Sequence, residues 1–315
     1  MRNVRGAILF GKFLTNAKGV AALTVITADT IVWFTPIMLF TLFKIVIPVR
    51  PFRNLMTRWI MAMGENWVSF NAFVFSAVNK VEWQLTGIED LDKKHWYMVF
   101  ANHQTWVDIV ILQTVFNRRI PFLKFFLKQQ LIWFPFLGIA FWAMDMPFMR
   151  RHSKSYLAKH PEKKGSDLVA TRKACQKFRD TPTTVINFLE GTRFSEIKRE
   201  KKNSPFEHLL PPRAGGVAIA LSAMGDMFDA VLDVSIVYPD RVPKFWDMMC
   251  GKMTKVIVDV VTLPVETWYV GADYANDREF RQRFHRWLTD VWQNKDRRIG
   301  AIKEEAQAAS AGSAA

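Results

Sequence analysis

The chain has 315 residues, half of them hydrophobic, with 26 Phe, 12 Trp and a formal net charge of +14. Two cysteines, Cys175 and Cys250, are too few for a disulfide framework and have no zinc-ligand neighbours, so we expect two small apolar side chains in a reducing compartment. The length is enough to bury a substantial core. Positive charge beside much aromatic surface suggests an anionic membrane face or a nucleic acid as partner.

The first 80 residues are predicted to form membrane-associated helices. From Val20 to Pro48 only Asp29 and Lys44 are charged, and this run is too long for a signal-peptide core. As one helix it would be about 40 Å long, more than the ~30 Å hydrocarbon core of a bilayer. Basic residues flank both ends, so the positive-inside rule gives no direction for a single span. The run fits a tilted single span or a hairpin that bends near Pro36 with both ends on the cytoplasmic face.

A second helix is expected from Leu55 to Val81, where apolar residues recur at helical spacing and polar residues occupy the other positions. Such an amphipathic helix can pack on the core of a domain. It can also lie in the headgroup region of a membrane with Trp at the boundary. The apolar segment before it favours the headgroup position.

After Lys80, short β-type runs alternate with helical runs, which favours an α/β domain around a central sheet over residues 81–300. Strands are expected at 81–86, 96–101, within 118–128, and at 145–151, 183–189, 230–238 and 255–263. Helices are expected at 104–116, 133–144, 165–180, 214–224 and 277–298. The tail at 301–315, which includes "AQAASAGSAA", has little to bury and is expected to be disordered.

The segment "ANHQTWVD" places His103 and Asp108 five residues apart at the end of an expected strand. In a regular helix this separation turns about 140°, so the two side chains meet only if His103 lies in the loop before the helix. A carboxylate bonded to one ring nitrogen fixes the tautomer and leaves the other nitrogen free as a general base. A purely structural His–Asp contact would leave the same pattern.

The segment "VINFLEGTRFS" places Glu190, Gly191, Thr192 and Arg193 directly after another expected strand. Glycine lets the backbone approach a ligand closely, threonine offers a hydroxyl, and the guanidinium of arginine matches a phosphate bidentately. The segment predicts a phosphate-binding loop, although Gly-Thr is also common in ordinary turns.

Two further segments are less specific. "LKQQLIWFPFLG" contains Lys128, and the basic pair Arg150 and Arg151 follows an expected strand, while "VLDVSIVYPD" is a buried strand that ends before a proline. Taken together, in this order and spacing, the four blocks resemble the PlsC-type glycerolipid acyltransferase family from about Val81 to Pro239. The NHxxxxD and EGTR blocks are the specific parts of the resemblance.

Within that family, "NFLEGTRFS", "LLPPRAGG" and "SIVYPD" look like the bacterial YihG type. The family pattern usually has Pro before the Glu, where this chain has Leu189. The fourth family block often begins with Pro, whereas here it begins with Val234-Ser235. These departures concern the subgroup and the choice of substrate more than the reaction.

The resemblance implies that His103 removes the proton from a glycerol hydroxyl while Asp108 orients the imidazole. The hydroxyl then attacks the thioester carbonyl of acyl-CoA or an acyl carrier protein, which serves as co-substrate, and no other cofactor is implied. Glu190, Gly191, Thr192 and Arg193 match the acceptor-binding block, so Arg193 is expected to hold the phosphate of 1-acylglycerol-3-phosphate (lysophosphatidic acid), and the product is phosphatidic acid for phospholipid synthesis.

Lys128 and either Arg150 or Arg151 match less certain substrate-binding contributors. The resemblance further implies a central mixed sheet flanked by helices, the bacterial inner membrane as location, and a site that faces the cytoplasm and anionic lipid. The chain has no G-x-S-x-G elbow, which argues against a serine esterase. It has no HExxH-like spacing, so no catalytic metal is expected.

Two alternatives stay open. The acceptor can be another lysophospholipid with the same chemistry, or the chain can be a basic membrane-anchored protein that binds anionic lipid or nucleic acid. No helix-turn-helix, zinc-finger or RNP signature is present, so nucleic acid is not expected as a partner. The sequence leaves the oligomeric state open.

Overall fold

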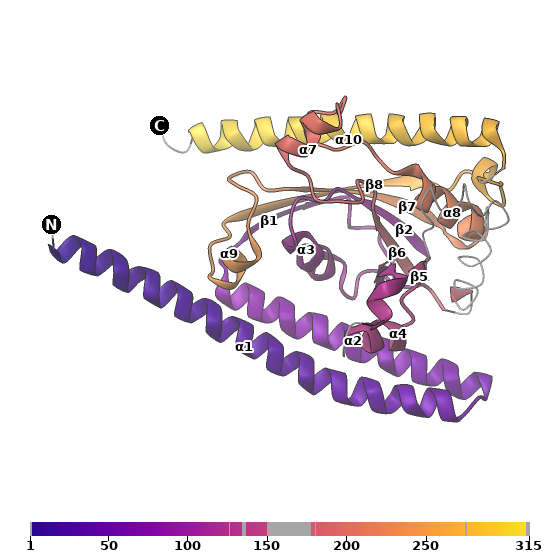
Figure 1. The fold of residues 1–315 in the computed structure, drawn as a ribbon, viewed down its shortest axis with the longest axis horizontal. Coiled ribbons are helices and arrows are strands. Elements are labelled where there is room, and N and C mark those ends of the chain that lie inside the picture. The colour runs from indigo at the N-terminus through magenta and orange to yellow at the C-terminus, as the bar shows by residue number, and fades with distance from the viewer. Residues whose placement is uncertain are drawn as a thin grey trace. The chain divides into compact units, whose positions relative to one another are not determined.

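The computed structural model describes residues 2–125, 127–133, 137–149, 178–179, 181–274 and 276–312 (Figure 1). The chain forms two compact units that interleave in sequence. The first contains residues 1–84, 105–117 and 238–257, and the second contains 85–104, 118–237 and 258–315. In the first unit, two later segments, α3 and α9, pack against the N-terminal helices. The domain boundary expected at residue 80 stays a prediction.

The first unit begins with two long helices, α1 (Arg2–Val46) and α2 (Arg50–Val78), which lie side by side (Figure 1). It also contains α3 (Val107–Phe116), which packs on α2, and α9 (Phe245–Met249), which packs on both long helices. Cys250 is buried beside α9, as expected for a small apolar side chain. Cys175 lies outside the described residues.

Of the two arrangements that the sequence allows, the hairpin that bends near Pro36 is wrong, because α1 continues through that residue. The chain instead turns between α1 and α2, where Pro48 disfavours a helical conformation for the residue before it. Pro51 stands at the start of α2, where its missing N–H leaves no helical bond unmade. The turn between the helices is thus set by Pro48 and by Pro51 in the first turn of α2, and not by Pro36 inside α1.

The two helices differ in how much apolar surface they bury. Within the described residues, Leu9–Val46 is the one helical stretch long and apolar enough to cross a membrane, and only 6% of its most apolar window is buried. The helix α2 is amphipathic, as predicted, and buries one face in the first unit while Leu55, Trp59 and Phe73 stay exposed. The headgroup position of α2 stays a prediction.

Six strands form the main sheet, in the order β1-β8-β7-β2-β6-β3. They are β1 (Glu82–Thr86), β2 (Tyr97–Ala101), β3 (Leu123–Phe125), β6 (Thr184–Phe188), β7 (Ala230–Val237) and β8 (Lys255–Pro264). A second, two-stranded sheet pairs β4 (Leu127–Lys128) with β5 (Phe148–Met149). Within the described residues, the remaining helices are α4 (Leu137–Ala143), α7 (Glu196–Lys201), α8 (Ala214–Met224) and α10 (Arg278–Gly312), with 3-10 turns at Gln129–Trp133, Gly225–Met227 and Thr267–Tyr269.

The α/β architecture is confirmed, and its centre is β2. This strand lies between β6 and β7, is parallel to both, and is buried along its whole length. The register places Ala101 opposite Phe188 on one side and opposite Val234 on the other. Since the strands are parallel, the residues that follow them gather at one edge, where ligands bind in many α/β proteins.

Helix α10 runs along the sheet and contacts β7 (Figure 1). Its inner face buries Phe284 and Trp292 completely. The disorder expected for the tail is wrong as far as Gly312, because α10 continues to that residue. The alanines of the tail have high helix propensity and prolong a helix already held by its packing. The helix expected at 165–180 lies almost entirely outside the described residues.

Candidate active site

Two backbone hydrogen bonds connect the loop after β2 with the loop after β6. The N–H of His103 donates to Oε1 of Glu190 at 2.8 Å, and the N–H of Phe194 donates to the carbonyl of His103 at 2.6 Å. The two motifs that sequence analysis singled out are therefore joined at one edge of the sheet, by a bond between residues 87 positions apart along the chain.

The carboxylate of Glu190 lies inside the protein and is fully buried. Its second oxygen accepts a hydrogen bond from the N–H of Leu210 at 3.0 Å. Charge-assisted bonds of this kind are stronger than neutral ones. These contacts position the backbone around His103, and the part of Glu190 in substrate binding stays a prediction.

Asn102 fastens the end of β2 to β7. Its buried side-chain amide donates to the carbonyl of Ile236 at 2.9 Å and accepts from the N–H of the same residue at 2.8 Å. Gln104 donates to the same carbonyl at 2.8 Å. The residues on both sides of His103 are thus held by one position of β7, which limits the movement of the backbone at His103.

The imidazole of His103 is partly exposed and stacks on the ring of Phe188, with centroids 4.1 Å apart and an angle of 19° between the planes. Phe125 stacks behind Phe188 at 6.3 Å. This aromatic support covers one face of the imidazole and restricts its rotation.

The loop after Glu190 is sharply turned. Gly191 has φ +64°, a conformation that favours glycine, and an added Cβ would lie 2.7 Å from Cδ of Arg213. The ammonium of Lys198 donates to the hydroxyl of Thr192 at 3.0 Å and to the carbonyl of Arg193 at 2.8 Å. Arg193 itself is exposed. The loop therefore presents backbone, hydroxyl and guanidinium groups together.

Three further cations lie around this loop, and sequence analysis did not select them as site residues. Lys198 contacts it directly, and the pKa of Lys202 is lowered by partial desolvation and then by the nearby charge of Arg213. The two lysines belong to the basic segment "IKREKK", which reads as a solvated surface, while Arg213 belongs to "LLPPRAGG". Together with Arg193 they make the loop strongly positive, which suits an anionic ligand.

Asp108 lies in the first turn of α3, in the first unit, and is fully buried. One carboxylate oxygen accepts from the N–H of Thr105 at 2.9 Å, and the other accepts from the hydroxyl of Tyr238 at 2.8 Å. Burial raises the pKa of Tyr238 well above its usual value, and the charge of Asp108 adds to the effect. Asp108 is thus a buried, oriented carboxylate, and its expected bond to the imidazole of His103 stays a prediction.

The side chains of the other predicted site residues lie outside the described part of the chain. Lys128 is in β4, but its side chain is outside the described part of the chain, and Arg150 and Arg151 are outside it entirely. Within the described residues, no three His, Cys, Asp or Glu side chains gather in a way that could hold a metal ion.

A family model described as Acyltransferase matches residues 82–239. The chain is 28% identical over 199 residues to the probable 1-acyl-sn-glycerol-3-phosphate acyltransferase 5 of Arabidopsis thaliana, covering 59% of this chain and 50% of that protein. It is 22% identical over 250 residues to the mouse (Mus musculus) 1-acyl-sn-glycerol-3-phosphate acyltransferase epsilon, covering 72% of this chain and 64% of that one. The chain therefore spans between half and two thirds of the length of these relatives.

Among solved structures, the chain is similar to the 1-acyl-sn-glycerophosphate acyltransferase PlsC of Thermotoga maritima. The TM-score is 0.53 with 17% identity, and the match covers 96% of this chain and 98% of that one. At this identity the likeness concerns the fold.

Proposed function

Because the chain belongs to the acyltransferase family, we propose that it transfers a fatty acyl chain from an acyl thioester to the free hydroxyl of 1-acylglycerol-3-phosphate, which makes phosphatidic acid. The observation that carries this proposal is the pair of bonds between the backbone of His103 and the loop of Glu190 to Phe194. A general base and a phosphate-binding loop would then act at one strand edge. The names of the two relatives support this acceptor.

In the proposed reaction, neutral His103 accepts the proton of the acceptor hydroxyl as the oxygen attacks the thioester carbonyl. The tetrahedral intermediate collapses, the carbon–sulfur bond breaks, and the leaving thiolate takes the proton from the imidazolium. The products are an ester and a free thiol, and the imidazole is neutral again. Asp108 is proposed to hold the imidazole in the correct tautomer, and no covalent enzyme intermediate is needed.

The phosphate of the acceptor is proposed to bind Arg193, beside the backbone at Gly191 and the hydroxyl of Thr192. Lys198 and Arg213 add positive charge at this loop. Glu190 is proposed to act by position, since both of its oxygens accept backbone N–H groups. Lys128 and either Arg150 or Arg151 stay proposed contributors to substrate binding.

The setting of the reaction is also a proposal. The apolar helix α1 supports attachment to a membrane, and we place the protein at the bacterial inner membrane with the site facing the cytoplasm and anionic lipid nearby. The donor is acyl-CoA or an acyl carrier protein. The YihG type stays a prediction.

The test is an acyl-transfer assay on the detergent-solubilised full chain, with labelled oleoyl-CoA or an acylated carrier protein and a panel of lysophospholipids. We expect His103→Ala to lower kcat by about 10²- to 10⁴-fold, which is the usual contribution of a general base. His95→Ala is the matched control, because His95 is an exposed histidine of the second unit. It should turn over like wild type.

Phosphatidic acid made by wild type and the His95 variant, but not by the His103 variant, would establish the reaction and the base together. Product from a different lysophospholipid would keep the mechanism and change the acceptor. Unchanged turnover by His103→Ala would contradict the role of His103. No product with either donor, from folded protein, would contradict the proposal and favour the basic lipid-binding alternative.

A further inference from the structure

The residue that follows strand β7, Tyr238, is buried and contacts the aspartate of the NHxxxxD motif. Its hydroxyl donates to Oδ1 of Asp108 at 2.8 Å, and Tyr238 is only 5% exposed. The two residues are 130 positions apart along the chain. The NHxxxxD pattern does not specify this contact, which therefore comes from the fold.

A second contact holds the same turn of the chain from the same loop. The hydroxyl of Thr105 donates to the carbonyl of Pro243 at 2.7 Å. The N–H of Thr105 donates in turn to Oδ2 of Asp108 at 2.9 Å. The segment from Tyr238 to Pro243 thus contacts Asp108 directly and again through Thr105. All of these residues belong to the first unit.

The hydrogen bond from Tyr238 fixes the plane of the carboxylate. The terminal torsion of an aspartate side chain is broad, so a hydrogen bond to Oδ2 by itself leaves the carboxylate able to rotate. A donor on the other oxygen adds a second fixed point. A carboxylate can accept about four hydrogen bonds, so these two leave acceptor capacity for the N–H of an imidazole.

The hydroxyl of Tyr238 stays protonated and therefore remains a donor. Burial raises the pKa of Tyr238 well above its usual value, and the charge of Asp108 and the hydrogen bond to it raise this pKa further. Since the phenol donates to a carboxylate, the bond is charge-assisted and stronger than a bond between neutral groups.

We propose that Tyr238 is a positioning residue for the acyl transfer, because its hydroxyl holds the carboxylate of Asp108 in the orientation from which Asp108 fixes the imidazole of His103. The inference rests on the proposed function, in which Asp108 sets the tautomer of the base. Tyr238 touches no reacting atom in this role. Without its hydroxyl, Asp108 would spend less time in the productive orientation, and a smaller share of the bound complexes would react. Binding of the two substrates would not change.

The test is steady-state acyl transfer by the detergent-solubilised full chain, with labelled oleoyl-CoA or an acylated carrier protein and a lysophospholipid, each varied in turn. Tyr238→Phe keeps the buried ring and removes only the hydroxyl. We expect it to lower kcat about tenfold, which corresponds to 1.4 kcal/mol and is close to the contribution of one hydrogen bond to a charged group. The KM for each substrate should stay within about twofold of wild type, because the lost contact acts in the transition state.

A double-mutant cycle separates positioning from general support of the fold. Asp108→Asn keeps the shape of the side chain, removes the charge that stabilises the imidazolium, and should lower kcat more than Tyr238→Phe does. In the Asp108→Asn background, adding Tyr238→Phe should change kcat by less than about twofold, since the hydroxyl acts only through the carboxylate. A merely structural role would lower kcat by the same factor in both backgrounds.

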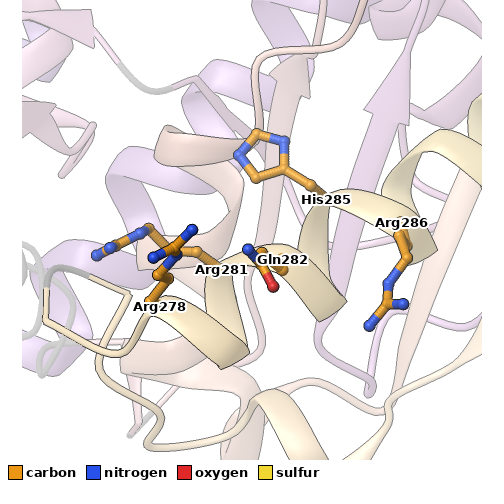
Figure 2. Close-up of a pocket in the computed structure, with 5 residues that line it drawn as sticks. All are labelled: Arg278, Arg281, Gln282, His285 and Arg286. Atoms are coloured by element: carbon orange, nitrogen blue, oxygen red, sulfur yellow. The ribbon is translucent and has the colours of Figure 1, made fainter.

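Two other tyrosines provide matched controls, because each loses one hydrogen-bonded hydroxyl when it is changed to Phe. Tyr97, at the start of β2, is 4% exposed, and its hydroxyl accepts the N–H of Asp92 at 3.1 Å. The hydroxyl of Tyr274 is hydrogen bonded to Nε2 of His285 at 3.0 Å, and Figure 2 shows His285 with other polar side chains on the first turns of α10. Tyr97→Phe and Tyr274→Phe should both turn over like wild type. Thermal melts confirm that the variants fold.

The proposal is overturned if Tyr238→Phe turns over like the controls, if its loss lies in a KM, or if it lowers kcat equally in the Asp108→Asn background. A fully active Asp108→Asn variant overturns it as well. So does a Tyr238→Phe protein that fails to fold beside folded controls, because the hydroxyl would then be needed for the fold. No product from wild type with any acceptor or donor would contradict the proposed function, and this inference with it. Wild-type activity that Tyr238→Phe retains would contradict this inference alone.

Discussion

At the scale of single residues, His103 is held in place through its own backbone and through the residue before it. Glu190 accepts the N–H of His103, and the side chain of Asn102, the residue before His103, is hydrogen bonded to the backbone of Ile236 in β7. The side chain of His103 is left partly exposed with Phe188 against one face. If His103 is the base that we propose, this support lets it meet a substrate without rearrangement of its loop, which limits the entropy lost on reaching the transition state.

Arg193 is expected to act on one part of the acceptor only. Arg193→Ala should raise the KM for lysophosphatidic acid about tenfold or more, because a bidentate charge-assisted contact is lost. The kcat should change little, since phosphate binding is made in the ground state as well. Steady-state kinetics with the acceptor and the donor varied in turn provide the measurement.

Arg199→Ala is a suitable control for that experiment, because Arg199 lies on α7 near the loop but pairs with Glu196 at 2.9 Å. Its KM values should match wild type. An increase confined to the KM of the acyl donor in the Arg193 variant would place Arg193 on the wrong substrate.

His208 is expected to make stability depend on pH. Partial burial and then the charge of Lys303 lower the pKa of His208 below its usual value, and the ammonium of Lys303 lies 3.2 Å from Nδ1. The folded state therefore binds fewer protons than the unfolded state around the usual histidine pKa. Stability should be greatest above about pH 6.5 and should fall as the pH drops through and below that value.

The variant His208→Gln tests this by thermal melts between about pH 8 and pH 5, since the histidine titrates near 6.5. Its Tm should fall less on acidification than the Tm of wild type. His95→Gln, which alters an exposed histidine, should follow wild type. An equal fall in all three proteins would assign the pH dependence to other groups.

At the scale of elements, α10 is tied to the strand ends by a buried ion pair. The ammonium of Lys295 donates to Asp233 at 2.7 Å and to the carbonyl of Val234 at 2.6 Å, and neither charged side chain has more than 2% exposure. Burial lowers the pKa of Lys295, while Asp233 opposes the shift. Arg298 also pairs with Asp233. Lys295 also donates to the carbonyl of Phe100 in β2 at 3.3 Å, so the helix holds β2 and β7 together three residues before His103.

Lys295→Met should lower the free energy of unfolding by about 3 kcal/mol, because it removes one partner of a buried pair and leaves a carboxylate less compensated. Lys295→Met/Asp233→Leu should recover much of this loss, since both charges of the buried pair are removed and Arg298 keeps Asp259 as a partner. Denaturant melts of the detergent-solubilised chain measure both effects. Arg297→Met, at an exposed site on α10, should stay within about 0.5 kcal/mol of wild type. A single variant as stable as the control would show that the pair contributes nothing.

At the scale of the whole molecule, a net charge of +14 and one long apolar helix allow two modes of membrane attachment, electrostatic and hydrophobic. Salt distinguishes the two modes, because it screens the charge contacts and weakens electrostatic attachment, whereas it does not screen the burial of apolar surface. The exposed apolar side chains of α1 favour hydrophobic attachment.

The full chain in isolated membranes should therefore stay in the pellet after washes with high salt and be released by detergent. Immunoblots of pellet and supernatant after ultracentrifugation measure this. A protein known to bind the same membranes through charge alone should be released by the salt wash. Release of this chain by salt would contradict hydrophobic attachment through α1 and favour the basic binding protein.

The sequence alone determined the elements and the order of the motifs. Strand and helix periods are local properties, so β2, β6, β7 and the amphipathic α2 followed from short windows. The same reasoning was wrong at Pro36 and in the tail. An internal proline and a lack of residues to bury did not end these helices, because extending a helix that is already formed costs far less than starting one.

Only the tertiary structure decided how these segments work together. The contacts of Glu190, Asn102 and Lys295 join residues from 20 to 195 positions apart. Two of the basic groups around the loop at Arg193, Lys198 and Lys202, come from a segment that looks like ordinary solvated surface. No window of sequence contains both partners of such a contact. The chemical groups of each residue follow from the sequence. Which residues become their neighbours depends on the parallel register of the sheet, which brings distant strand ends to one edge.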